Sequence, residues 1–255
     1  MNQSLGPGPH TRVRRLPEKA AYDAATIFDI LDGAVMCHVA ATVDGLAMAL
    51  PTLHARLDTT IYLHGSRSNA LFRAALDAGV ASLSVTIYDG LRVARSAFES
   101  SIAYRSVVVV GAIREVNDPE EKRRALRAVL EAALPGRGVE VRARNEREEN
   151  LTLVMALSID EASAKVSYGP TSDEPEDAAL PIWSGVVPAR LVYDEPIAST
   201  DGAMADGAAL ACAAGAMAGS AAPARPATST ASAPTATSAV ATRGFKVMRD
   251  PRLQG

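Results

Sequence analysis

A turn with phosphate-binding residue types follows a short apolar run in the stretch IYLHGSRSNA, residues 61–70. The pattern predicts a strand that ends here and a helix that begins, with Ser66 or Ser68 at its cap. At such a helix start, unpaired backbone N–H groups and the positive end of the dipole face outward. Arg67 adds a cation, and the serine hydroxyls and the Asn69 amide can donate to phosphate oxygens. The same residue types also suit plain helix capping, so this stretch leaves both interpretations open.

A second polar cluster lies in RSAFESSIAYRSVVVVG, residues 95–111, just before a strongly apolar strand. Tyr104, Arg105 and Ser106 place an aromatic ring, a cation and a hydroxyl side by side. A strand needs none of these groups at its start, which favours a ligand site. A solvated loop with charged residues is the alternative interpretation.

The four histidines are His10, His38, His54 and His64. No carboxylate stands near His54 or His64 at ligand spacing, so we expect no metal site. Imidazole titrates near neutral pH, which makes His54 and His64 candidates for proton delivery or for tuning a bound ring. Each of the two could equally be a hydrogen-bonded strand residue.

Common motifs for nucleotide, metal and acyl-transfer chemistry are missing from the sequence. There is no G-x-G-x-x-G after a strand, no G-x-x-x-x-G-K, no C-x-x-C and no G-x-S-x-G. Lys and Arg number 26 against 29 Asp and Glu, a net charge of -3, so no basic field predicts nucleic-acid binding. The remaining classes are soluble globular proteins with a less common ligand site.

Three segments differ in composition. We expect a flexible N-terminus over residues 1–13, a folded domain over 14–194 and a disordered tail over 195–255 that is rich in Ala, Ser, Thr and Pro. The tail is too poor in large apolar residues to span a membrane. No apolar run follows the basic residues near the start, and the two cysteines lie far apart, so a cytoplasmic location is expected.

Apolar periodicity predicts a mainly β domain with added helices. A helix start is expected at Pro17, and Asp32-Gly33 should end that first helix. Further helices are expected from residue 70, after Asn117-Asp118-Pro119, and over 145–155. Strands are expected over 34–42, 46–55, 59–65, 104–116, 163–169 and 185–193, with two more β runs over 80–98 about a turn at 88–90. Such hairpins imply a largely antiparallel sheet, and closure into a barrel would remove its edges.

An ordered series of segments resembles the pyridoxamine 5′-phosphate oxidase-like flavoproteins, in particular their flavin-nucleotide-binding branch, to which nitroimidazole-resistance proteins are related. The series is VMCHVAATVDGLAMALPTLHARLDTTIYLHGSRSNALF, VARSAF, YRSVVVVG, DEASAKV and PIWSGVVP, and the similarity spans residues 14–193. It implies an FMN-binding split β-barrel with the flavin at a homodimer interface.

The resemblance also implies which residues contact the flavin. Those along the isoalloxazine ring would be Pro51, Thr52, Leu53 and His54. Those near the phosphate or ribityl chain would be Leu63, His64, Gly65, Ser66, Ser68 and Asn69, with Arg67 or Arg105 supplying charge. Tyr104, Arg105 and Ser106 match another part of the site, reached from the partner subunit. Trp183, the only tryptophan, would pack at the flavin edge, at the dimer contact or in the core.

Two departures from the family pattern affect function. Many members have an Arg-Lys pair where this chain has Ser68-Asn69. True pyridoxamine 5′-phosphate oxidases carry Arg-x-His on the last strand, whereas Arg190 is followed here by Leu191 and Val192, so vitamin B6 synthesis is not expected. The resemblance implies an FMN-dependent oxidoreductase that acts on a small organic molecule, with NADH or NADPH as electron donor. The alternatives are a flavin-binding or storage module without turnover, and a non-flavin interaction protein.

Overall fold

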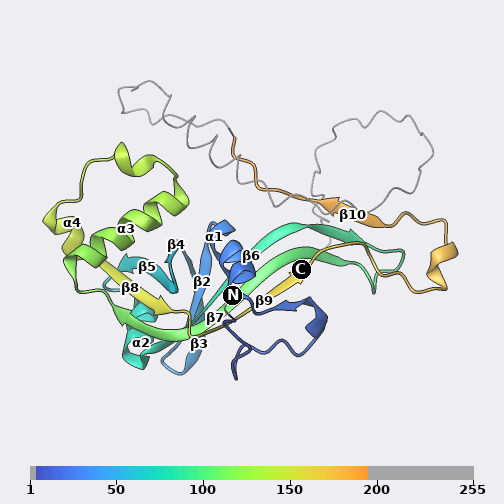
Figure 1. The fold of residues 1–255 in the computed structure, drawn as a ribbon, viewed down its shortest axis with the longest axis horizontal. Helices are drawn as coiled ribbons and strands as arrows, with labels where there is room; N and C mark the ends of the chain where they lie inside the picture. Colours follow the sequence, from blue (N-terminus) through green and yellow to red (C-terminus); the bar gives the residue numbers. More distant parts are fainter. Residues whose placement is uncertain (1–3, 195–255) are drawn as a thin grey trace, which may run out of the picture. The chain divides into compact units, whose positions relative to one another are not determined.

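The computed structural model of the chain describes residues 4–194, which form one mostly antiparallel sheet with a few helices (Figure 1). The strands are β1 (Ala20–Ala21), β2 (Cys37–Val43), β3 (Leu46–Thr52), β4 (His54–Leu57), β5 (Thr60–Ser66), β6 (Val80–Val93), β7 (Ser101–Glu115), β8 (Thr152–Ser158), β9 (Glu161–Ser167) and β10 (Gly185–Pro188). The helices are α1 (Ala24–Gly33), α2 (Ala70–Ala78), α3 (Pro119–Ala133) and α4 (Glu146–Leu151), with 3-10 turns η1 (Pro17–Lys19), η2 (Arg137–Val139) and η3 (Asp177–Ala179).

The strands pair in the order β3-β2-β6-β7-β8-β5-β4, with β9 between β7 and β1, and β10 on the free part of β6. The ladders between these strands are antiparallel, which confirms the expected sheet type. The path begins and ends with β3 and β4, which are neighbours in the chain and are separated only by Leu53. The sheet is therefore the mainly β split-barrel arrangement expected from the sequence.

Strand β7 divides the sheet into two parts. One edge of β7 pairs with β6 over most of its length. The other edge pairs with β9 over Tyr104–Val110 and then with β8 over Ile113–Glu115. At the changeover, the Ala112 amide donates to the Asp160 carboxylate at 2.7 Å. A Cβ on Gly111 would lie 1.8 Å from the Ser158 carbonyl oxygen, so this crossing requires glycine.

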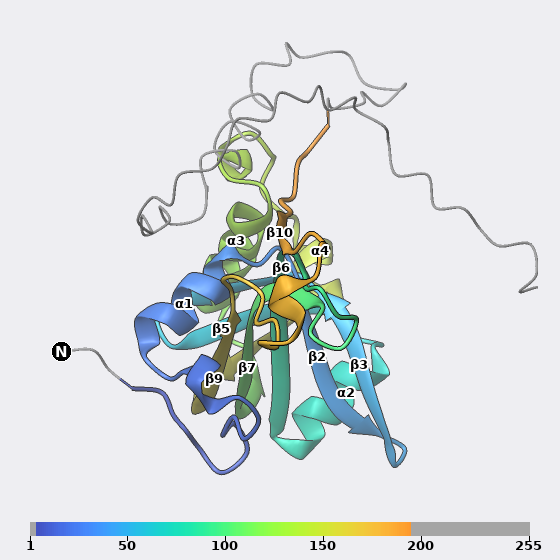
Figure 2. The same cartoon turned by 90° about the vertical axis from the view of Figure 1, so that its right-hand side faces the viewer.

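The main core lies between the inner face of the sheet and helices α1 and α2. Helix α1 packs toward β9 and α2 toward β2 and β3, as Figure 2 shows. Alternate strand residues face this core, as expected for strands with a side-chain period of two. The fully buried side chains include Ile27, Leu31, Val39, Leu63, Leu83, Val107, Val109 and Met155.

A second, smaller core forms on the outer face of β4, β5 and β8, under α3. Tyr62 and Val154 on the strands meet Leu126 and Val129 on the helix. The Tyr62 hydroxyl donates to Glu121 at 2.8 Å, which ties α3 to β5. Strand β8 is therefore buried on both faces, so it has no polar alternation.

Local signals set several boundaries as expected. Asp118 caps α3 by accepting from the Glu121 amide, and Pro119 occupies the first turn. Helix α1 ends at Gly33, as predicted, and the β2–β3 hairpin turns at Asp44 and Gly45, both with positive φ.

Several expected element bounds are wrong. The first helix begins at Ala24 after the Asp23 cap, whereas Pro17 opens only a 3-10 turn. Residues 80–93 form one strand, because the expected turn at 88–90 is a β-bulge that the long β7 ladder spans. The helix expected over 145–155 ends at Leu151, and the following residues form β8, because both cores need that strand's apolar side chains.

The structure holds residues 4–13 against β9, although this segment was expected to be flexible. The Ala162 amide donates to the Leu5 carbonyl at 2.9 Å, and Glu161 accepts from the His10 amide and the Thr11 hydroxyl. The tail expected over 195–255 lies outside the described residues. Among residues 4–194, no helix is long and apolar enough to cross a membrane.

Substituting Gly111 by Ala should destabilise the fold, because the new Cβ would overlap the Ser158 carbonyl. We expect the free energy of unfolding in urea to fall by about 1–3 kcal/mol or more. Gly33→Ala is the matched control, because its Cβ would meet only the Ile87 side chain at 3.4 Å. Equal stability of the two variants would show that the β7 crossing tolerates a side chain.

Candidate functional site

The turn between β5 and α2 has the geometry of a helix start. Asn69 is the cap of α2, since its side chain accepts from the Phe72 amide at 3.2 Å. The prediction of Ser66 or Ser68 at the cap is therefore wrong. Ser66 instead accepts from the Ser68 amide at 3.2 Å, and their hydroxyls lie 2.8 Å apart. The first amides of α2 have no acceptor within the helix and point toward this turn.

Arg67 in this turn is already partnered. Its Nη1 lies 2.8 Å from Glu115 Oε1 at the end of β7, and its Nε donates to the Asn150 carbonyl at 2.9 Å. About half of the side chain stays exposed. Arg67 therefore brings hydrogen-bond donors to the turn, while Glu115 cancels most of its charge.

Gly65 is required for packing at the same turn. A Cβ there would lie 2.4 Å from the Phe72 ring, which belongs to the main core. The neighbouring Leu63 is fully buried in that core. Gly65 and Leu63, both predicted flavin contacts, therefore pack the turn against the main core.

Strand alternation separates the predicted triplet Tyr104, Arg105 and Ser106. Tyr104 is paired with Tyr88, and Ser106 with Thr86, on the outer face of the sheet. Arg105 points to the opposite face, toward α1, where its guanidinium binds Asp89 through two hydrogen bonds of 2.9 and 3.0 Å. Arg105 also lies 3.9 Å from Asp29 of α1. Arg105 therefore ties the bulge of β6 to the main sheet.

The turn at Arg67 and the triplet lie at opposite ends of β7. Arg67 contacts Glu115, ten residues along the strand from Arg105. At about 3.3 Å per residue, the two ends are of order 30 Å apart. Within one chain, the two predicted parts of the flavin site are thus too far apart to contact one phosphate.

The remaining predicted ring contacts also divide between faces. Pro51 lies beside His38 on the outer face of the sheet, whereas Thr52 lies beside buried Cys37. Leu53 forms the link between β3 and β4. Trp183 is mostly exposed just before β10, next to Ser184, which accepts a hydrogen bond of 2.8 Å from Arg95.

His54 is buried in the main core, with 4% of its surface exposed. Its Nε2 donates to the Leu31 carbonyl at the end of α1 at 2.9 Å, and its Nδ1 has no partner. Burial lowers the pKa of His54, although the Leu31 carbonyl and the charge of Asp32 act in the opposite direction. The neutral imidazole therefore supplies a hydrogen-bond donor to a carbonyl in the last turn of α1.

His64 lies on the other face of β5, two residues from Tyr62 and beside Val154 of β8. Neither ring nitrogen has a hydrogen-bond partner among the described residues, and the Nδ1 atom is buried. Burial lowers the pKa of His64, and the nearby positive charge of Arg144 lowers it further. A neutral imidazole with unused lone-pair capacity is the form that ligates metals.

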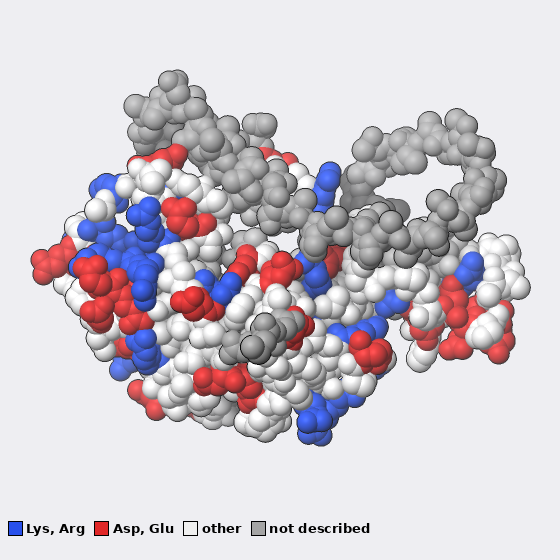
Figure 3. Space-filling model, viewed as in Figure 1, with Lys and Arg blue, Asp and Glu red and all other residues white. Residues whose placement is uncertain are grey.

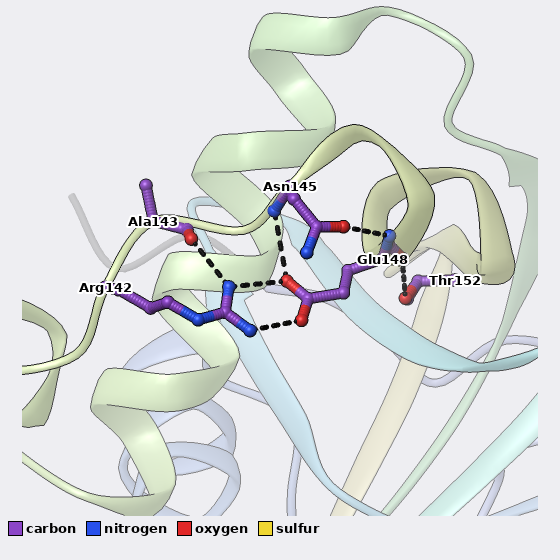
Figure 4. A network of polar contacts seen from close by, with 5 residues as sticks. All are labelled: Arg142, Ala143, Asn145, Glu148 and Thr152. Carbon is purple, nitrogen blue, oxygen red and sulfur yellow. Dashed lines mark hydrogen bonds and ion pairs between the residues drawn. The ribbon is translucent and has the colours of Figure 1, made fainter.

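A polar network fixes the loop that carries Arg144 (Figure 4). Asn145 and Glu148 form a capping box at the start of α4, with bonds of 2.9 and 3.0 Å. Arg142 binds the Glu148 carboxylate at 2.9 Å and the Ala143 carbonyl at 3.0 Å. Sequence reasoning missed Arg144, since only the fold of this loop brings it near His64.

A groove of about 330 Å³ lies beside the turn at Arg67. It is lined by Arg67, Arg73, Leu76, Asp77, Glu115 and Leu153. The sequence contains no signal for this groove, because its walls come from α2, β7 and β8.

Comparisons with known proteins define the class of this protein. The family model described as pyridoxamine 5′-phosphate oxidase matches residues 23–166. The flavocytochrome Anf3 from Azotobacter vinelandii is 34% identical, with a TM-score of 0.73, covering 78% of this chain and 92% of that one. The FAD and heme binding protein from Mycobacterium smegmatis is 35% identical, with a TM-score of 0.69, covering 73% and 92%. No curated protein matches this chain.

The chain belongs to the pyridoxamine 5′-phosphate oxidase family, as the sequence resemblance predicted. A candidate 5-nitroimidazole antibiotic resistance protein from Bacteroides thetaiotaomicron shares the fold at 19% identity and a TM-score of 0.50, covering 58% of this chain and 86% of that one. Within residues 4–194, no group of three or more His, Cys, Asp or Glu side chains could hold a metal ion.

Stability should fall as the pH drops below about 6.5, because the unfolded chain then binds protons that folded His54 resists. His64 contributes with the same sign. His54→Gln keeps a donor for the Leu31 carbonyl but does not titrate, so the loss of unfolding free energy between pH 7.5 and 5.5 should be smaller. The slope per histidine is at most about 1.4 kcal/mol per pH unit. Urea unfolding curves at several pH values measure this slope. An equal slope in His54→Gln and in the unmodified protein would contradict the assignment of the pH dependence to His54.

Proposed function

We propose that this chain is a homodimeric flavoprotein that binds FAD and a non-covalent haem and transfers electrons between a small organic molecule and a second redox partner. The observation that carries the proposal is the pair of relatives at 34% and 35% identity, each matched over 92% of its length, one a flavocytochrome and the other an FAD and heme binding protein. A flavin supplies hydride or single-electron chemistry when bound, and haem iron supplies single-electron chemistry.

The four histidines can be tested for haem ligation by their contacts. His10 is bound to Glu161, and His54 is buried and bound to Leu31. His38 lies exposed on the outer sheet face, and His64 lies partly buried beside Arg144. Haem brings four nitrogen ligands of its own, so one imidazole from the protein is enough. His64 fits this role best, with Arg144 available to a propionate carboxylate.

The charge of the turn at Arg67 favours FAD over FMN. The terminal phosphate of FMN is nearly a dianion at pH 7, whereas each phosphate in FAD carries one charge. Glu115 already neutralises Arg67, so the turn offers hydroxyls, amides and one shared guanidinium. Such a site suits the more diffuse charge of a diphosphate. FMN, which the sequence resemblance implied, is the alternative cofactor. A comparison of the Kd values of FAD and FMN decides between them.

Two copies of the chain would complete the site. The turn at Arg67 and the outer-face residues Tyr104 and Ser106 lie at opposite ends of β7, so a second copy must bring them together if both contact one flavin. The outer sheet face between them carries mostly small or apolar side chains. His38, Ser84 and Val108 cross it in one row over three strands. This face is the proposed dimer contact.

The residues of the chain then have defined tasks. The Ser66–Asn69 turn binds phosphate, Arg67 orients it, and the outer sheet face excludes water from the flavin ring. His54 keeps α1 in place beside β4. NADH or NADPH is the proposed electron donor, and anaerobic bleaching of the flavin by either would distinguish an enzyme from a storage module.

The purified protein should be coloured, with flavin bands and a haem Soret band in its visible spectrum. His64→Ala should lose the Soret band and keep the flavin bands, because it removes the imidazole that would hold the haem iron. His38→Ala, which removes an exposed histidine of the same sheet, should keep both. A colourless protein that takes up neither added FAD nor FMN would overturn the proposed function. A Soret band that survives His64→Ala would exclude His64 as the haem ligand.

Val108→Glu should convert the dimer to a monomer and weaken flavin binding at least tenfold, because an unpaired charge in an interface costs several kcal/mol. Val108 is 41% exposed in the single chain. Val139→Glu is the matched control, because Val139 is 79% exposed on η2, away from this face. Sedimentation velocity measures the outcome, and a Val108→Glu dimer that still binds flavin would exclude this face as the interface.

A further inference from the structure

The groove beside the Arg67 turn has unused binding groups. Arg73 and Asp77 stand four residues apart on one face of α2, a spacing that usually allows an ion pair. Within the described part of the chain, neither forms an ion pair or a side-chain hydrogen bond. Both are exposed and line the groove. A cation and an anion therefore stand side by side with their hydrogen-bonding capacity free.

The opposite wall and floor add complementary chemistry. Leu76 lies on α2 beside Arg73 and also lines the groove, and Leu153 of β8, 2% exposed, lines it from the sheet. Together they form the apolar part of the groove lining. Glu115 contributes a second carboxylate, held in place by Arg67 at 2.8 Å. Arg67 thus stands at the junction between the groove and the turn.

We infer that this groove binds the adenosine diphosphate half of a dinucleotide, and its continuity with the Ser66–Asn69 turn assigns that half to FAD. The two leucines would contact the adenine ring. The carboxylates of Asp77 and Glu115 would accept hydrogen bonds from ribose hydroxyls and the exocyclic amine, and Arg67 and Arg73 would bind the diphosphate. A volume of about 330 Å³ suits one nucleoside and excludes a whole dinucleotide. This inference rests on the proposed flavin site only for the source of the nucleotide.

Charge balance agrees with this ligand. Two guanidinium groups and two carboxylates line the groove, so its net charge is near zero. A simple anion such as phosphate gains little in such a place, because the carboxylates repel it. A nucleotide carries anionic oxygens at one end and hydrogen-bond donors at the other, so it can use both signs.

The test compares four ligands on the full chain after removal of bound cofactor: FAD, FMN, ADP and NADH. The variants are Arg73→Glu and Asp77→Ala, both at exposed positions where substitution should leave the fold intact. Arg127→Ala, at an exposed position of α3 outside the groove, is the matched control. Isothermal titration gives each Kd, and thermal melting confirms that each variant folds.

We expect Arg73→Glu to weaken FAD and ADP at least about tenfold and to leave FMN within about twofold, because only FAD and ADP reach the groove. ADP should also compete with both FAD and FMN for the unmodified protein, because its terminal phosphate corresponds to the phosphate of FMN. If the variants weaken NADH and ADP but leave FAD unchanged, the adenosine diphosphate comes from NADH, and the assignment to FAD is overturned.

Equal weakening of FAD and FMN, or no change in any Kd, would overturn the groove as an adenosine diphosphate site. Failure of the proposed function looks different. Binding of ADP that is sensitive to Arg73→Glu, in a protein that binds neither FAD nor FMN, would support the groove as an adenosine diphosphate site and exclude the proposed flavoprotein function.

Discussion

The crossing of β7 at Gly111 is the constraint on which the rest of the structure depends. One strand keeps β6 on one edge and exchanges β9 for β8 on the other. The exchange is possible because Gly111 has no side chain where the Ser158 carbonyl passes, and because Asp160 accepts from the Ala112 amide that the exchange would leave unpaired. The Asp160 carboxylate therefore supplies the hydrogen bond that the changeover of partner strands would otherwise leave unmade.

The exchange creates two surfaces with different chemistry. The inner face is filled by α1 and α2 and holds His54 as a packed, neutral residue. The outer face of β5 and β8 is covered by α3, and at its margin neither ring nitrogen of His64 has a partner within residues 4–194. Two histidines ten residues apart in sequence therefore have unlike environments. Only the second has the exposure and the cationic neighbour that a bound prosthetic group would use.

Internal pairing of arginines shapes what this protein can bind. Arg67 is held by Glu115, Arg105 by Asp89 and Arg95 by Asp173. Figure 3 shows blue and red side chains mixed over the face drawn, in agreement with the near balance of charges in the sequence. Phosphate recognition therefore cannot depend on a field of free cations. At the Ser66–Asn69 turn it must depend on hydroxyls, helix amides and the shared Arg67 guanidinium, an arrangement better suited to a diphosphate than to a terminal phosphate.

The sequence by itself determined the fold class, the family and most strand and helix positions, because period-two apolar runs, the Asp118-Pro119 cap and the Asp44-Gly45 turn are local signals. It also located the turn at Ser66–Asn69, although not its cap. Strand β8 was hidden, since burial on both faces removes the alternation that identifies a strand. Only the tertiary structure could divide Tyr104 and Ser106 from Arg105, pair the arginines with carboxylates from distant segments, and bring Arg144 to His64. Those relations depend on which strands become neighbours, and no local pattern records that choice.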